Sequence, residues 1–432
     1  MYEELLLEWN LWWKNNFQRN FKKRDKLEEI KKNLDNDLII SLIGIRRSGK
    51  TQLLYETINY LIKTGVDKHA CFFIKIDDLR IKDKLNLNLI YKLIEEREIL
   101  FGKTEKLYLF FDEIQEMNNW QQALKTLYDL NKSKYKIIIT GSNASLLKEE
   151  LSDYLTGRKI DLEVYPFSFK EYLNANININ LDNKIEILEN KVKIKRIFLN
   201  YLNGSSFPEI NFDKVNRVDY LKNLHETIVL KDVVLRYKLT NSSKILDVSR
   251  YIITNSTKPF NYLKISSNLE ISKDSFSLYI NYFENVFLFF KIYLYDYSLK
   301  KQQINEKKIY VIDQGFLNFL AFKFSEDKGR LLENLVFIEL KRRGKEIYYH
   351  KQKKECDFVI KEGLGIVQAI QVTQSLEDID TKKREIAGLL DACSAYKLKT
   401  GLILTQDEED EFEQDGVKIQ VMPIWKWLLV EN

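Results

Sequence analysis

Two glycines, a lysine and a threonine stand at fixed spacing within eight residues of the N-terminal part of the chain. Residues 44–51 read Gly-Ile-Arg-Arg-Ser-Gly-Lys-Thr, which fits the pattern Gly-x-x-x-x-Gly-Lys-Thr. In this pattern the glycines let backbone N–H groups wrap around phosphates, the lysine neutralises β/γ-phosphate charge and the threonine hydroxyl binds Mg²⁺. The pattern therefore predicts a loop that binds ATP, with contacts from Gly44, Arg47, Ser48, Gly49, Lys50, Thr51 and Gln52.

An acidic pair, Asp112 and Glu113, directly follows the apolar residues 107–111. Such a run predicts a buried parallel strand with an acidic tip. After a phosphate loop, we expect Asp112 to hold the water shell of Mg²⁺ and Glu113 to polarise the attacking water. Most isolated acidic pairs are solvated, but the position of this pair after the loop and a strand favours the catalytic interpretation.

Small polar residues follow the next apolar run, residues 136–140. Ser142 and Asn143 would then lie at the carboxyl edge of the sheet, where an open α/β sheet binds its ligand. We expect one of the two to orient the attacking water against the γ-phosphate. The alternative is that they cap a helix at residues 144–151.

Arg158 follows Thr156 and Gly157 in a predicted turn. An arginine in such a turn can stabilise transition-state charge, either in its own site or in that of a neighbouring subunit. A surface arginine without a catalytic role is the alternative, and the sequence leaves these interpretations open.

These residues need a scaffold that brings them to one edge. Residues 38–43 predict a strand that runs directly into the phosphate loop. Residues 52–63 predict a helix, whose positive N-terminus would face the same phosphates. Further strands at residues 70–76 and 136–140 complete an alternation of strands and helices, which predicts an α/β fold with a parallel sheet.

Composition limits the remaining possibilities. A chain of 432 residues predicts two to four domains, and 45% hydrophobic with 30% charged residues is typical of globular protein. No apolar run has the length of a membrane span, and the N-terminus lacks the pattern of a signal peptide, so we expect a cytoplasmic protein that does not bind membranes. A net charge of +5 is too small to indicate nucleic-acid binding by itself.

The motifs together resemble those of prokaryotic AAA-type ATPases that carry a C-terminal domain of unknown function. The resemblance extends from Arg24 to Trp427 and implies ATP and Mg²⁺ as cofactors, with the residue roles given above. It is carried by the phosphate loop, Phe-Phe-Asp-Glu-Ile-Gln at 110–115, Trp120, Ile-Thr-Gly-Ser-Asn-Ala at 139–144, Thr-Gly-Arg at 156–158 and Pro-Phe-Ser-Phe-Lys-Glu-Tyr at 166–172.

The middle of the chain predicts a helical module and then a winged helix. Residues 185–202 read as one or two amphipathic helices, which AAA-type proteins use as a small lid. Three helices and two ribbons between residues 245 and 312 follow the order of a winged helix, with a wing at 298–306. Lys273 and Ser275 would face the major groove and Lys300 and Lys301 the phosphates; a protein-contact surface is an equal alternative.

The C-terminal quarter resembles the core of PD-(D/E)XK nucleases. Glu333 lies on a predicted helix, Asp357 at the start of a strand, and Gln371 and Thr373 share one face of the next strand. The nuclease chemistry needs an acid and a lysine at the last two positions, because carboxylates hold the metal and the lysine steadies the nucleophile. Thr373 cannot supply that charge, so a fold without cleavage activity is favoured.

The sequence thus predicts a P-loop NTPase with a parallel sheet and helical lid, an α+β winged helix and a small α/β nuclease-like domain. We expect Mg²⁺-dependent ATP hydrolysis that drives conformational change on double-stranded DNA. The alternatives are a nucleotide-gated switch or scaffold for a protein partner, and an ATPase-coupled nuclease; a homo-oligomer is compatible with each. The predicted segments are an N-terminal helical segment at 1–25, the ATPase core at 26–165, the lid and connector at 166–235, the winged helix at 236–315 and the nuclease-like domain at 316–432.

Overall fold

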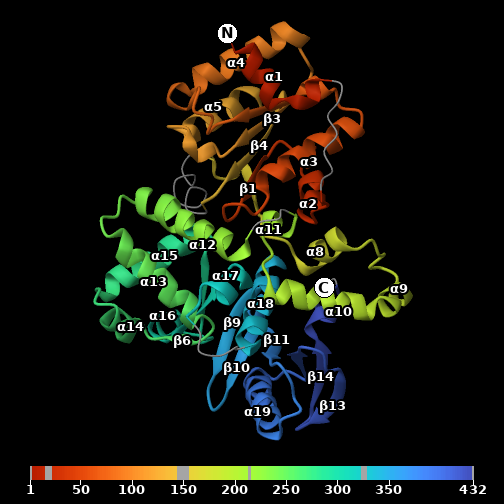
Figure 1. Cartoon of the computed structure of the whole chain (residues 1–432), viewed down its shortest axis with the longest axis vertical. Helices are drawn as coiled ribbons and strands as arrows, with labels where there is room; N and C mark the ends of the chain where they lie inside the picture. The colour runs from red at the N-terminus through yellow and green to blue at the C-terminus, as the bar shows by residue number, and fades with distance from the viewer. Residues whose placement is uncertain (1, 15–21, 144–154, 213–215, 323–327, 431–432) are drawn as a thin grey trace. The chain divides into compact units, whose positions relative to one another are not determined.

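The chain divides into two compact units, residues 1–166 and 167–432. A computed structural model describes residues 2–14, 22–143, 155–212, 216–322 and 328–430 (Figure 1). Among these residues, none of the helices combines the length and apolar character that crossing a membrane requires.

A five-stranded parallel sheet forms the centre of the first unit, in the order β2-β3-β4-β1-β5. Strands β1, β3 and β4 are buried along their whole length, because near-continuous apolar runs suit a sheet covered on both faces. This confirms the predicted α/β fold with a parallel sheet. The strands are β1 (Ile39–Ile43), β2 (Cys71–Lys75), β3 (Leu107–Asp112), β4 (Tyr135–Gly141) and β5 (Lys159–Glu163).

Helices connect these strands. In the first unit they are α1 (Glu3–Trp9), α2 (Lys26–Lys32), α3 (Lys50–Lys63), α4 (Leu87–Phe101) and α5 (Trp120–Asn131). Helix α3 buries its apolar face, including Leu53, Leu54 and Ile58, and follows β1 directly through the phosphate loop.

The N-terminal segment covers the outer edge of β2. The Asn10 side chain accepts a hydrogen bond from Phe73 N at 2.7 Å and donates one to Phe73 O at 3.1 Å. Trp12 and Trp13, in the short turn η1 (Leu11–Trp13), both donate their indole N–H to Cys71 O. Edge-strand groups that would otherwise stay unpaired are thus satisfied by side chains. Of the segment predicted at 1–25, residues 15–21 lie outside the described part of the chain.

Helices open the second unit. Ser168 begins α8 with a capping box, in which its side chain pairs with Glu171 N and the Glu171 carboxylate accepts from Ser168 N. The others are α9 (Lys184–Glu189), α10 (Lys191–Asn203), α11 (Pro208–Phe212), α12 (Arg217–Thr227) and a π-helical stretch η5 (Ile228–Leu235); α8 spans Phe169–Asn176.

The helices predicted as a lid have their described packing partners inside the second unit. Gln314 donates to Tyr201 O at 3.0 Å, and Asn318 donates to Leu202 O at the end of α10. Asp313 accepts from both the backbone and the hydroxyl of Ser206. These helices therefore belong with the C-terminal elements by packing.

Three helices and a small sheet follow. They are α13 (Ser242–Asn255), α14 (Tyr262–Asn268), α15 (Lys273–Asn285) and the sheet β6-β8-β7, with β6 (Pro259–Phe260), β7 (Phe289–Tyr293) and β8 (Lys307–Val311). Strands β7 and β8 pair antiparallel, as the two predicted ribbons require, but residues Leu299–Ile304 of the predicted wing form helix α16. Ser298 caps this helix, and its Leu-Lys-Lys-Gln-Gln-Ile sequence contains good helix formers and no turn residue.

A six-stranded mixed sheet closes the second unit, in the order β13-β14-β12-β11-β10-β9. Strands β9, β10 and β11 form an antiparallel meander, whereas β11, β12 and β14 are parallel. The elements are α17 (Gln314–Phe319), α18 (Lys328–Arg342), β9 (Glu346–Lys351), β10 (Glu355–Glu362), β11 (Gly365–Val372), α19 (Ile379–Tyr396), β12 (Thr400–Thr405), β13 (Asp410–Gln414), β14 (Val417–Pro423) and α20 (Ile424–Trp427).

Candidate functional site

The phosphate loop joins the end of β1 to the start of α3. Gly49 has φ 97°, a left-handed conformation that favours glycine, and immediately precedes α3. A Cβ on Gly44 would lie 2.1 Å from Val164 O, so only glycine fits beside the chain that leaves β5. Both glycines of the motif are therefore required by the backbone of the loop itself.

Two positively charged side chains, Lys50 of the loop and Arg24 beside it, donate hydrogen bonds to backbone carbonyls. Lys50 Nζ is buried and donates to Gly44 O at 3.0 Å and Ile45 O at 3.1 Å. Arg24, which precedes α2, is also buried and donates to Ser48 O at 2.8 Å and Tyr165 O at 2.6 Å. Sequence reasoning did not assign a site role to Arg24, because an arginine outside the motif carries no recognisable signal.

The other predicted loop residues differ in exposure. Ser48 is fully buried, and its Oγ has no hydrogen-bond partner among the described residues, which fits a loop shaped to receive a polar ligand. Arg47 has φ 66° and is exposed, as is Gln52. The structure therefore places Ser48 inside the loop and leaves the Arg47 and Gln52 side chains at its surface.

Three oxygen-bearing side chains meet at the carboxyl edge of the sheet. Thr51 Oγ1 lies 3.0 and 2.9 Å from the two oxygens of Asp112, and Thr140 donates to the same carboxylate at 2.7 Å. Burial, and then the negative charge of Glu113, raise the pKa of Asp112 to about 6. Hydroxyl and carboxylate oxygens are ligands that fit Mg²⁺, either directly or through its water shell. The donor set formed by Thr51 and Asp112 therefore suits the predicted metal.

Glu113 lies one residue beyond this carboxylate in a strained backbone conformation. Its φ of 55° is uncommon for a residue with a side chain, and its N–H donates to Thr140 Oγ1 at 2.8 Å. Such outliers persist where the surrounding structure holds them, which occurs often at active sites. The backbone therefore leaves the strand conformation at Glu113, directly after Asp112 ends β3.

Gln115 connects the acidic pair to the tip of β4. Its side-chain amide nitrogen donates to the Glu113 carboxylate and, at 3.3 Å, to Ser142 Oγ. Ser142 and Asn143 are both buried, and the helix that they were predicted to cap lies outside the described residues. Gln115 was not predicted as a site residue, although its place in Asp-Glu-Ile-Gln was the signal available.

Arg158 lies at the amino-terminal ends of the strands, opposite the carboxyl edge that carries Thr51 and Asp112. It directly precedes β5, which pairs in parallel with β1 so that Lys159 is opposite Ile39 and Glu163 is opposite Ile43. The phosphate loop follows Ile43, so the length of a strand, about 16 Å, separates Arg158 from it. Arg158 instead pairs with Asp129 at 3.1 Å. Arg158 therefore lies at the other end of its strand from the phosphate loop of its own chain.

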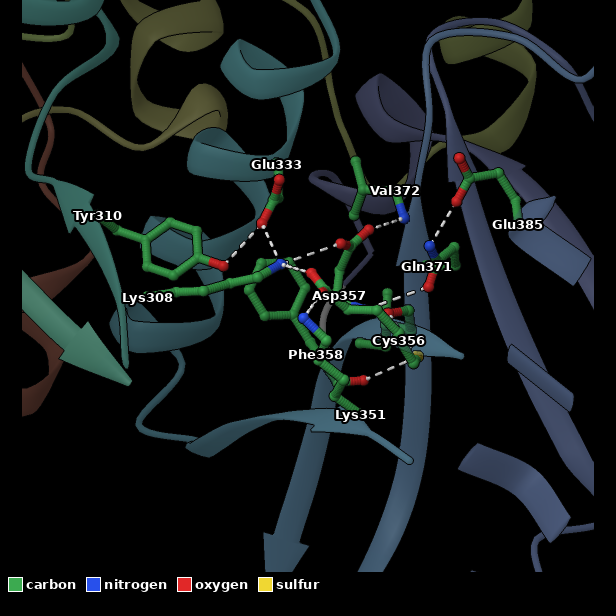
Figure 2. A network of polar contacts seen from close by, with 12 residues as sticks. Lys308, Tyr310, Glu333, Lys351, Cys356, Asp357, Phe358, Gln371, Val372 and Glu385 are labelled. Carbon is green, nitrogen blue, oxygen red and sulfur yellow. Dashed lines mark hydrogen bonds and ion pairs between the residues drawn. The ribbon is translucent and has the colours of Figure 1, made fainter. Parts of the chain in front are cut away.

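Three of the four residues predicted for a nuclease-like site, Glu333, Asp357 and Gln371, lie in a second cluster, in the second unit. Glu333 on α18 and Asp357 on β10 face a common centre, which Lys308 of β8 occupies (Figure 2). No group of three or more Asp, Glu, His or Cys side chains in the described ranges is arranged to hold a metal ion. The sequence did not indicate a role for Lys308, because two adjacent lysines in a strand are normally expected to be exposed to solvent.

Gln371 and Thr373 use their polar groups within the protein. Gln371 Oε1 accepts from Asp357 N at 3.2 Å, and its Nε2 donates to Glu385 on α19. The Thr373 hydroxyl donates to Ser375 O at 3.3 Å. The structure thus brings Glu333, Asp357 and Gln371 into one network and leaves Thr373 in a local turn.

The residues predicted to contact DNA lie on two helices. Lys273 is exposed on the first turn of α15, where Ser275 pairs with the capping residue Ser272. Lys300 and Lys301 are exposed on α16, and Lys301 lies 3.8 Å from Asp296. Ser275 is therefore engaged in capping its own helix.

Comparison with known proteins divides the chain into three regions. Residues 36–173 match an AAA domain, and residues 195–327 and 328–427 match two domains of unknown function, DUF8612 and DUF4143. The uncharacterized protein MJ1544 of Methanocaldococcus jannaschii is 33% identical over 434 residues, covering 94% of this chain and 93% of that protein. An uncharacterized protein of Haemophilus influenzae is 29% identical over 411 residues, covering 93% of this chain and 97% of its own.

Among solved structures, AMPPCP-bound DnaA from Aquifex aeolicus is similar to this chain at 17% identity. The match covers 62% of this chain and 89% of the DnaA chain, with a TM-score of 0.27.

The Gln115 bridge predicts a selective effect on turnover. Replacing Gln115 with alanine removes the donor that fixes Glu113 relative to Ser142, so we expect kcat for ATP to fall about 10- to 100-fold. The dissociation constant for ATP should change less than about threefold, because no residue of the phosphate loop is altered. Steady-state kinetics and nucleotide titration measure the two quantities. Gln122→Ala, at an exposed glutamine of α5, is the control; equal losses in both variants would contradict the positioning role.

Proposed function

Because this chain belongs to the same family as the uncharacterized protein MJ1544 of Methanocaldococcus jannaschii and carries an AAA domain, we propose that it binds ATP with Mg²⁺ and hydrolyses it. The observation that carries this proposal is the network of Thr51, Asp112 and Glu113 at the carboxyl edge of the sheet. When bound there, Mg²⁺ would neutralise phosphate charge.

The residues of the chain divide the work of hydrolysis. Lys50 binds the β- and γ-phosphates, and the loop N–H groups orient them. Glu113 accepts the proton of the attacking water as general base. Ser142 and Asn143 orient that water, and Gln115 keeps the Glu113 carboxylate in line with Ser142.

We further propose that the second unit consists of a helical connector at 166–235, a winged-helix-like module at 236–315 and a PD-(D/E)XK-like module at 316–432. In this proposal the nucleotide state of the first unit changes the conformation of these modules. Duplex DNA is the first candidate partner, supported by the exposed Lys273, Lys300 and Lys301.

A protein partner is the second candidate. Two observations favour it: helix α16 stands where a wing would contact phosphate, and Ser275 is used in the cap of α15. In this case hydrolysis would reset a nucleotide-gated switch.

Two substitutions separate nucleotide binding from turnover. Lys50→Ala should abolish ATP binding, because the positive charge at the phosphates is lost. Glu113→Gln should retain binding and lower kcat by about 100-fold or more, because an amide cannot accept the proton. Equilibrium binding of ATP and phosphate release measure the two effects. Glu116→Gln, which alters the next acid of the same segment, should turn over normally, and normal turnover by Glu113→Gln would refute its role as general base.

A mixing experiment tests whether Arg158 acts between subunits. Neither Arg158→Ala nor Glu113→Gln should turn over well alone, but mixing them should restore activity, because some sites then combine an intact Glu113 with an intact Arg158 of a neighbour. Phosphate release is measured across mixing ratios. Asp129→Ala, which breaks the ion pair but keeps the arginine, is the control and should remain active. A mixture no faster than its components would exclude this role.

Salt dependence distinguishes the two candidate partners. If duplex DNA is the partner, it should raise the ATPase rate, and the stimulation should vanish as salt rises from about 50 to 200 mM. The variant Lys300→Gln/Lys301→Gln should lose most of it. A rate that is indifferent to duplex DNA at low salt would instead favour the protein partner.

A further inference from the structure

One lysine stands at the centre of three carboxylates in the second unit. Lys308 Nζ lies 2.9 Å from Glu355 Oε1, 3.2 Å from Glu333 Oε1 and 3.4 Å from Asp357 Oδ1 (Figure 2). Its side chain is only 2% exposed, whereas those of Glu333 and Asp357 are 12% and 13% exposed. Tyr310, two residues along β8, also donates to Glu333 at 2.8 Å. The ammonium is therefore buried, and its partners surround it.

The charges of this cluster fit a permanently protonated lysine. Burial opposes the charged form of Lys308, but the charges of Glu333, Asp357 and Glu355 outweigh it and raise the lysine pKa well above its ordinary value. Burial and the charge of Glu333 in turn raise the pKa of Asp357. The Lys308 ammonium is thus the positive charge that offsets part of the negative charge of these three carboxylates.

Asp357 and Gln371 use their polar atoms for contacts within the protein. Asp357 uses Oδ1 for Lys308 and Oδ2 for the N–H of Val372, at 3.0 Å. The Gln371 side-chain amide accepts a hydrogen bond from Asp357 N and donates one to Glu385. Glu385 also forms an ion pair with Arg384 at 2.6 Å. The residues that PD-(D/E)XK chemistry would use for a divalent cation do not fit one here.

We propose that the Lys308 ammonium replaces the divalent metal of this PD-(D/E)XK-like module. The module then binds no metal, does not cleave nucleic acid, and is held to the three-stranded sheet by the ion cluster. Lys308 comes from β8, whereas Glu333 comes from α18 and the other two carboxylates from β10, so the cation joins the regions that match two separate domains of unknown function. This proposal is independent of the ATPase activity.

The first experiment measures metal binding by the full chain without nucleotide. Electron paramagnetic resonance of Mn²⁺ should detect no Asp357-dependent binding to the wild-type protein up to about 1 mM. Lys308→Met keeps the length of the side chain and removes its charge, and it should gain one Mn²⁺ site. That site should be lost in Lys308→Met/Glu333→Gln/Asp357→Asn. Binding to wild type that Asp357→Asn abolishes would overturn the proposal, as would a folded Lys308→Met without a new site.

The second experiment tests charge balance and remains decisive if Lys308→Met folds poorly. An uncompensated cluster of buried carboxylates is strongly destabilising, so the melting temperature of Lys308→Met should fall by about 5 °C or more. The triple variant, which removes two negative charges with the positive one, should regain most of that loss. Lys351→Met, which breaks only a half-exposed pair with Glu355, is the matched control and should melt like wild type. A triple variant no more stable than Lys308→Met would refute the neutralising role.

Discussion

The parallel direction of β1, β3 and β4 is the constraint on which the nucleotide site depends. Parallel strands that are buried on both faces must all end at the same edge, and their connecting residues are therefore collected there. Thr51, Asp112 and Ser142 come from three separate stretches of the chain: Asp112 ends β3, Ser142 directly follows β4, and Thr51 begins the helix that the phosphate loop joins to β1. The same constraint separates Arg158 from them, because it precedes its strand.

The sequence predicted this part well, since each motif depends on local order. An apolar run followed by glycines or acids determines both the strand and the identity of the residue at its tip, so Lys50, Thr51, Asp112 and Glu113 could be assigned together. Gln115 and Arg24 each contribute two hydrogen bonds through long side chains. Their partners are decided by side-chain packing, which residue spacing does not encode.

The second unit was harder to predict for a physical reason. Its important contacts join residues distant in sequence, as Lys308 with Asp357 or Gln314 with Tyr201. A lysine is normally solvated, and only the tertiary fold reveals that three carboxylates compensate its burial. The predicted wing differed for another reason: β7 and β8 do pair antiparallel, but local helix propensity and the Ser298 cap make helix α16 in the segment that joins them.

Asn10, Trp12 and Trp13 supply, from side chains, hydrogen bonds that a further strand would make to β2. A foreign strand could pair with this edge only after displacing two buried indoles and an amide. The first unit is thereby protected against runaway strand addition along β2, the route by which exposed sheet edges seed aggregates. Copies of this chain that associate must therefore recognise one another by surfaces other than the backbone of β2.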